Sequence, residues 1–128
     1  MFRILIVEDM QSFRKSLREI LEGGFPNVAI EEAANGKEAL ERTDSFCPDL
    51  VFMDIRLPDE SGLELTKKIK VQCPHVNVVM FTSHDIPEYR EAATRYGAAG
   101  FLVKGTATRE DVQSLVKSFF SNQEITST

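Results

Sequence analysis

Short apolar runs alternate with amphipathic stretches along the whole chain. Most of the runs carry Val, Ile, Leu or Phe at consecutive positions, which is typical of strands buried on both faces of a sheet. The second run alternates more and contains Glu31-Glu32, so we expect that strand at an edge of the sheet. The pattern predicts five strands, over Arg3–Val7, Val28–Ala33, Leu50–Met53, Val76–Phe81 and Gly100–Val103.

Between the strands, apolar residues recur at the spacing of one helix face, most clearly near the two ends of the chain. Gly and Pro residues separate the elements. The alternation predicts a doubly wound α/β fold, with a five-stranded parallel sheet, five helices on its two faces and right-handed crossovers. Three helices are predicted from apolar faces that lie within Phe13–Leu21, Leu63–Ile69 and Val112–Phe120, and two weaker ones over Gly36–Ser45 and Pro87–Tyr96.

The length of 128 residues is that of one ordinary domain, and 42% hydrophobic with 27% charged residues is a globular composition. We expect the domain to cover residues 1–121. The polar segment 122–128 is predicted to be a frayed tail or the stub of a linker.

The charge balance is 15 basic against 20 acidic residues, and no basic run offsets the net −5. Direct nucleic-acid binding by this domain is therefore not expected. The apolar runs are too short to cross a membrane, and the first ends in Glu8-Asp9 rather than in a secretory cleavage site. Cys47 and Cys73 lack C-x-x-C spacing, so we expect reduced thiols and a cytoplasmic protein.

Polar side chains follow four of the five predicted strands. Alone, each such residue is commonly a helix cap, a turn residue or a solvated side chain. The carboxyl ends of parallel strands meet at one edge, however, where ligands of such sheets bind. Complementary chemistry at four strand ends therefore indicates one shared site. The residues are Glu8-Asp9 after the first strand, Asp54 after the third, Thr82-Ser83 after the fourth and Lys104 after the fifth.

These residues, in this order, resemble the receiver domains of two-component response regulators over essentially the whole chain. The resemblance implies a flavodoxin-like, CheY-like sheet with strand order 2-1-3-4-5. Pro58 lies four residues after Asp54 and Gly62 eight after, as in the family pattern. The motifs that carry the resemblance are Glu8-Asp9, Met53–Pro58 with Gly62, Thr82-Ser83 and Gly100–Lys104.

The resemblance implies that Asp54 accepts a phosphoryl group from a phosphohistidine of a sensor histidine kinase or a phosphotransfer protein. A carboxylate nucleophile of this kind forms an aspartyl phosphate. Three crowded carboxylates repel one another, and their hard oxygens favour Mg²⁺. By analogy with the family, Asp9 and Asp54 bind the metal directly, Glu8 binds it through water, and the Arg56 backbone carbonyl completes the set. No organic cofactor is expected.

The same resemblance assigns the phosphoryl contacts and the switch. Lys104 pairs with the phosphoryl group, the Thr82 hydroxyl hydrogen-bonds another of its oxygens, and Phe101 occupies the aromatic switch position. Three further residues are expected to tune access and phosphate lifetime: Arg56, Ser83 and His84.

Gly105 follows Lys104 where many family members have proline. This departure, with the Met-Asp-Ile-Arg and Gly-Ala-Ala-Gly-Phe segments, makes the chain more like receivers of LuxR-like regulators than the chemotaxis type. Whether an output domain follows in a longer protein stays open. Adjacent Phe119 and Phe120 cannot both face the core, so one of them is expected to extend an apolar strip open to an output partner or to a homodimer.

The expected function is a phosphorylation-driven signalling switch that controls an output domain or effector, with transcription as the expected output, and it is not an enzyme. A degenerate receiver that acts without phosphorylation remains an alternative. An aspartyl-phosphate phosphohydrolase is disfavoured, because its general acid two residues after the nucleophile is replaced by Arg56. A flavodoxin-like electron carrier is disfavoured because Glu8-Asp9 would repel a phosphate.

Overall fold

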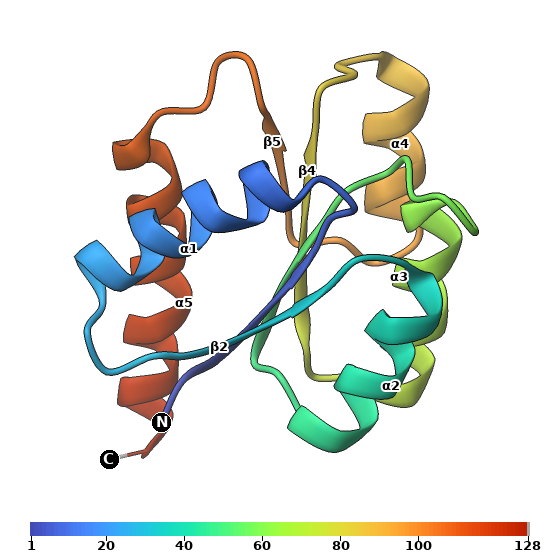
Figure 1. The fold of residues 1–128 in the computed structure, drawn as a ribbon. Helices are drawn as coiled ribbons and strands as arrows, with labels where there is room; N and C mark the ends of the chain where they lie inside the picture. Colours follow the sequence, from blue (N-terminus) through green and yellow to red (C-terminus); the bar gives the residue numbers. More distant parts are fainter. Residues whose placement is uncertain (128) are drawn as a thin grey trace.

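Five parallel strands in the order β2-β1-β3-β4-β5 form the centre of the molecule (Figure 1). The computed structural model describes residues 1–127, with side chains as far as residue 119. The predicted α/β fold class and strand order are confirmed, and β2 lies at an edge as expected. In chain order the elements are β1 (Arg3–Val7), α1 (Gln11–Gly24), β2 (Ala29–Ala33), α2 (Gly36–Phe46), β3 (Leu50–Met53), α3 (Gly62–Gln72), β4 (Asn77–Thr82), α4 (Pro87–Arg95), β5 (Gly100–Val103) and α5 (Arg109–Ser127).

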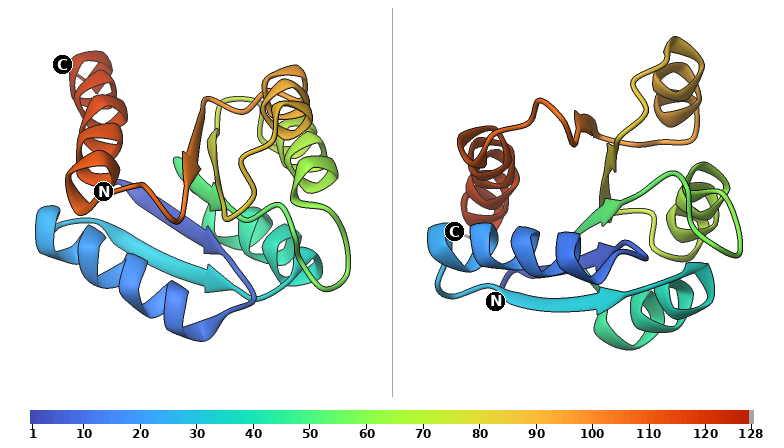
Figure 2. Two further views of the ribbon diagram at one scale, coloured as in Figure 1. Left: turned by 90° about the horizontal axis from the view of Figure 1, so that it is seen from above. Right: turned by 45° about the horizontal axis from the view of Figure 1, so that its top comes forward.

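The helices cover the two faces of the sheet in two groups, α1 with α5 and α2 with α3 and α4 (Figure 2). Alternate residues of β1 point to the two sides: Leu5 belongs to the core cluster under α2, α3 and α4, and Ile6 to the cluster under α1 and α5. All four residues of β3 are buried. This burial on both faces explains why the strands are nearly continuous apolar runs.

Several boundaries differ from the sequence-based ones by one residue, and helix α5 differs by more. Two strands, β2 and β4, begin one residue later than predicted, and β4 extends through Thr82. Helix α5 continues to Ser127, past the apolar positions that end at Phe120 and into the segment 122–128, for which the sequence predicts a frayed tail or the stub of a linker. The segment 121–127 contains no Gly or Pro that would stop a helix. The domain boundary at residue 121 stays a prediction.

The helix starts differ in how they are fixed. The Asn35 side chain caps α2 by accepting the Glu38 N–H at 2.9 Å, and the Glu38 carboxylate accepts the Ala34 N–H at 2.9 Å, which is a reciprocal capping arrangement. Ser61 caps α3. Helix α1 begins after Met10 without a side-chain cap. Among residues 1–127, no helix is long and apolar enough to cross a membrane.

Candidate functional site

The acidic residues that follow β1 and β3 meet at the carboxyl edge of the sheet. Glu8 and Asp54 are buried, and Asp9 is exposed. One carboxylate oxygen from each of the three residues lies within 4.8 Å of the others. The beginning of β1 and the end of α5 lie at the opposite edge, away from this cluster (Figure 1). The structure thus brings together the three carboxylates that the strand ends predicted, which we call the acidic cluster.

Lys104 follows edge strand β5, and its side chain reaches the acidic cluster. Its ammonium pairs with the Glu8 carboxylate and lies 3.4 Å from Asp54 Oδ2. The same ammonium lies 4.3 Å from the centre of the Phe13 ring. One lysine therefore faces three carboxylates, and the cluster keeps an excess of negative charge.

Asp9 shows the effect of this excess. The pKa of Asp9 is raised above its usual value. The largest cause is a hydrogen bond with the Glu8 carboxylate, followed by partial removal of the Asp9 carboxylate from water and by repulsion from the charge of Glu8. A divalent cation relieves such repulsion, and three carboxylate oxygens with one solvent-facing side are a donor set that suits Mg²⁺. The residues present therefore fit the metal that the sequence predicted.

The backbone of Asp54 is held by hydrogen bonds and close packing. Its N–H donates to the Val7 carbonyl at 3.0 Å, and the Gly62 N–H donates to the Ile55 carbonyl at 2.7 Å. A Cβ at position 62 would lie 1.9 Å from the Asp54 carbonyl oxygen, so only glycine permits this approach. The spacing of Gly62 eight residues after Asp54 thus has a steric reason. In the same loop, Arg56 forms an antiparallel bridge with Ser61.

Thr82 ends β4 beside β5. It is fully buried, and its hydroxyl accepts the His84 N–H at 3.2 Å, while Ser83 between them is exposed. The Lys104 N–H donates to the Thr82 carbonyl at 2.8 Å. A side chain at Gly105 would meet no atom within 4 Å, and within residues 1–127 the peptide bonds are trans.

Arg56 and Phe101 contact helix α4 through residues that the sequence did not single out. An Arg56 guanidinium nitrogen lies 3.4 Å from the Tyr89 hydroxyl. Phe101 is partly buried against the core under α4, and the Arg90 guanidinium lies 4.6 Å from its ring centre. These contacts join residues far apart in the chain, so no periodic pattern could reveal them.

A family model for the response regulator receiver domain matches residues 4–117. The chain belongs to this family. Response regulator UvrY of Escherichia coli is 34% identical to the receiver over 123 residues, which are 96% of this chain and 56% of UvrY. Chemotaxis protein CheY of Halobacterium salinarum is 39% identical over 102 residues, 80% of this chain and 83% of CheY.

Solved structures agree with this family. A CheY-like receiver domain protein from Methanospirillum hungatei superposes with a TM-score of 0.88 at 30% identity and covers 97% of both chains. A LuxR-family response regulator from Aurantimonas gives 0.85 at 27% identity, over 94% of this chain and 85% of that one. The receiver spans about half the length of curated relatives such as UvrY and ExaE, a transcriptional activator of Pseudomonas putida (56% and 49%).

Proposed function

We propose that this receiver domain accepts a phosphoryl group on Asp54 from a phosphohistidine of a sensor histidine kinase or phosphotransfer protein, in the cytoplasm and with Mg²⁺. The observation that carries the proposal is the acidic cluster with Lys104 beside it. Because the phosphoryl group stays on the protein, the domain acts as a regulatory phosphoacceptor rather than as an enzyme.

In the transfer, an Asp54 carboxylate oxygen attacks phosphorus, and the bond from phosphorus to the donor's imidazole nitrogen breaks with its electron pair leaving on the imidazole. The residues that would hold Mg²⁺ are Asp9, Asp54, the Arg56 carbonyl and, through water, Glu8, and the bound ion would supply positive charge to offset the carboxylates and the phosphoryl oxygens. Gly62 keeps the Asp54 backbone fixed during the transfer, since α3 abuts it.

Two residues then sense the product. Lys104, already 3.4 Å from Asp54 Oδ2, pairs with the phosphoryl group, and the Thr82 hydroxyl, whose oxygen accepts the His84 N–H, donates its hydrogen to a phosphoryl oxygen. Because Thr82 ends β4 directly before the loop to α4, and Lys104 lies in the loop from β5 to α5, their movement biases the position of Phe101 and the surface around it. A similar solved structure is of the BeF3-activated DrrB receiver domain (TM-score 0.85, 26% identity), which supports such an activated state here.

Tuning of the phosphate lifetime falls to three exposed or partly buried residues: Arg56, Ser83 and His84. We infer that Arg56, which reaches Tyr89, and His84, whose backbone is tied to Thr82, limit the access of water to the phosphoryl group. The small Ser83 leaves room for its entry.

The output is proposed to be transcription. The matched segment covers only about half of each relative named as a transcriptional regulator, 49% and 53%, which leaves room in them for an output domain. The partner of the switched surface is then an output domain, an effector protein or a second copy of the receiver. The apolar strip expected at Phe119 and Phe120 lies partly outside the described side chains, and Phe119 packs against the core cluster under α1 and α5.

Incubation with acetyl phosphate, with and without Mg²⁺, followed by intact-mass analysis tests the proposal. We expect the protein to gain one phosphoryl group only with Mg²⁺, and Asp54→Asn to gain none. Asp85→Asn, an exposed aspartate in the loop after β4, serves as the matched control and should still gain it. No gain from acetyl phosphate or from a phosphorylated kinase would contradict the proposal.

A further inference from the structure

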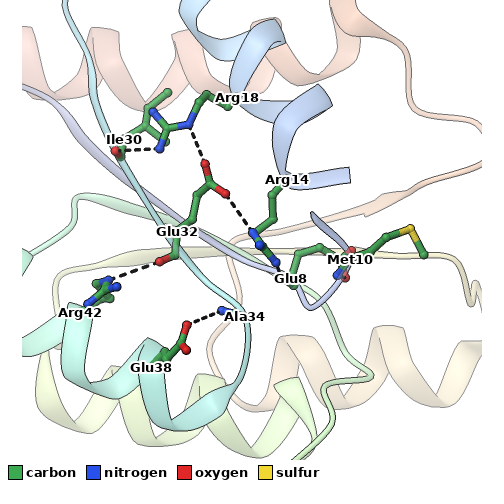
Figure 3. Close-up of polar contacts among 9 residues, drawn as sticks. All are labelled: Glu8, Met10, Arg14, Arg18, Ile30, Glu32, Ala34, Glu38 and Arg42. Carbon is green, nitrogen blue, oxygen red and sulfur yellow. Dashed lines mark hydrogen bonds and ion pairs between the residues drawn. The ribbon is translucent and has the colours of Figure 1, made fainter. Parts of the chain in front are cut away.

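Glu32, on edge strand β2, carries a partly buried carboxylate whose two oxygens are both paired (Figure 3). Arg14 Nε lies 2.9 Å from Oε1, and Arg18 Nε lies 2.6 Å from Oε2. Burial raises the pKa of Glu32, but the hydrogen bonds from Arg18 and Arg14 outweigh it and hold the pKa below its usual value. Glu32 is therefore an ionised anchor for two arginines of α1.

The two arginines differ in their second contact. Arg18 also donates to the Ile30 carbonyl at 3.2 Å, which lies on β2 itself. Arg14 Nη1 donates instead to the Glu8 backbone carbonyl at 2.6 Å (Figure 3). One guanidinium thus connects β2 to the β1–α1 loop that carries Glu8 and Asp9.

Helix α1 has no side-chain cap after Met10, so no capping residue holds the loop that precedes it. The Glu8 N–H donates to the Ala33 carbonyl at 3.0 Å, so Arg14 completes the fixation of Glu8 from its carbonyl side. The Met10 N–H then reaches the Glu8 carboxylate at 3.1 Å. The Arg14 side chain is only 15% exposed, so its bonds are shielded from water.

We propose that Arg14, anchored by Glu32, is a positioning residue that fixes the Glu8-Asp9 backbone for Mg²⁺ before the metal arrives. The inference rests on the proposed function, because it concerns the same metal. A loop that is ordered in advance loses less conformational entropy when it binds a metal. The contact of Arg14 with the Glu8 carbonyl should therefore strengthen Mg²⁺ binding. Loss of a charge-assisted hydrogen bond of this kind predicts a dissociation constant raised about tenfold.

Charge alone predicts the opposite result. Arg14 is a cation against the loop that carries Glu8 and Asp9, and its removal by itself would strengthen binding of another cation there. The direction of the change in Mg²⁺ affinity therefore separates positioning from simple electrostatics.

Calorimetric titration of Mg²⁺ into the wild-type chain, Arg14→Gln, Arg14→Lys and Arg18→Gln provides the test. Arg18→Gln removes the same charge and one bond to Glu32 but keeps the contact with Glu8, so its affinity should stay within about twofold. Lysine keeps the charge, yet one ammonium lacks the planar fork that reaches both Glu32 and Glu8. We expect both Arg14 variants to bind Mg²⁺ about tenfold more weakly.

Amide hydrogen exchange at Asp9 and Met10 in metal-free buffer gives a second readout. Exchange should be faster in Arg14→Gln than in the wild-type protein and unchanged in Arg18→Gln. Tighter or equal Mg²⁺ binding by Arg14→Gln, or equal exchange in the two variants, would overturn the inference. If the wild-type protein bound no Mg²⁺, the proposed function would fail, and the exchange rates would still decide whether Arg14 fixes the loop.

Discussion

The carboxylate of Glu32 and the three carboxylates of the acidic cluster have opposite electrostatic surroundings in this receiver. Glu32 on β2 meets two guanidinium groups, which hold its pKa below the usual value. In the acidic cluster, three carboxylates share one lysine, and the pKa of Asp9 is raised. The same kind of side chain is therefore matched in one region and unmatched in the other.

The difference separates stability from function. A matched carboxylate favours the folded state at neutral pH, whereas an unmatched group of them leaves repulsion that disfavours it. A cation that binds only the folded protein offsets this repulsion and stabilises the fold by mass action. On the proposed function, the acidic cluster is therefore the place where bound Mg²⁺ would stabilise the receiver.

The largest expected effect comes from moving the acidic cluster without touching Glu32. Gly62→Ala places a methyl group 1.9 Å from the Asp54 carbonyl oxygen, so the backbone must shift. We expect a loss of about 3 kcal/mol in the free energy of unfolding, together with slower phosphorylation by acetyl phosphate. Urea denaturation measures the first, and intact mass against time the second.

Gly105→Ala is the matched control, since its methyl group would meet no atom within 4 Å. Its stability should stay within about 0.5 kcal/mol of the wild-type value. Equal stability of the two alanine variants would contradict the steric role assigned to Gly62.

Removal of the matched carboxylate should have the next largest effect. Glu32→Gln removes the anionic partner of Arg14 and leaves Arg18 with only its longer pair to Glu22, at 3.5 Å, and it is expected to lower the free energy of unfolding by about 1–2 kcal/mol. Its neighbour Glu31 lies 3.6 Å from Arg42 with both side chains well exposed. Glu31→Gln should therefore cost less than about 0.5 kcal/mol, and a larger loss than in Glu32→Gln would refute the comparison.

The pairing of Glu32 also predicts a pH dependence. Because its pKa in the folded state is lowered from 4.5, the stabilisation is present above that value and disappears as the pH falls through the lowered pKa. The difference in unfolding free energy between wild type and Glu32→Gln should be constant near neutral pH and shrink in acid. A difference that grows in acid would mean that the arginines do not stabilise the ionised form.

The smallest expected effect on the free energy of unfolding is a gain rather than a loss. Asp9→Asn removes repulsion from the acidic cluster and should stabilise the metal-free protein, by less than about 1 kcal/mol because Asp9 is exposed and water screens its charge. The variant should also lose the stabilisation that Mg²⁺ gives the wild-type protein. Thermal melts in EDTA and in Mg²⁺ measure both, and destabilisation in EDTA would show that the cluster is not strained by its charge.

The sequence predicted the sheet and the meeting of the acidic residues because both depend on regular geometry. Apolar runs such as Leu50–Met53 report burial on both faces, and parallel strands bring their carboxyl ends to one edge. Asp54 and Glu8, separated by 46 residues in the chain, could therefore be placed together without a structure.

The contacts around the cluster could not be predicted in the same way. The pairing of Lys104 with Glu8, the anchoring of Arg14 on Glu32 and the contact of Arg90 with Phe101 depend on the rotamers and tertiary positions of long side chains. In the sequence, Glu32 indicated only that its strand lies at an edge of the sheet, and nothing indicated that it binds Arg14 and Arg18. The spacing of Gly62, eight residues after Asp54, could be read from the sequence, but its close approach to the Asp54 carbonyl could not.

The central claim is that the phosphoryl group goes to the unmatched cluster, on Asp54. Borohydride reduction of the protein after incubation with acetyl phosphate converts an aspartyl phosphate to homoserine, which peptide mass spectrometry locates. We predict homoserine at position 54 alone, and only when Mg²⁺ was present. Homoserine at another acidic residue, or equal conversion without Mg²⁺, would contradict the account.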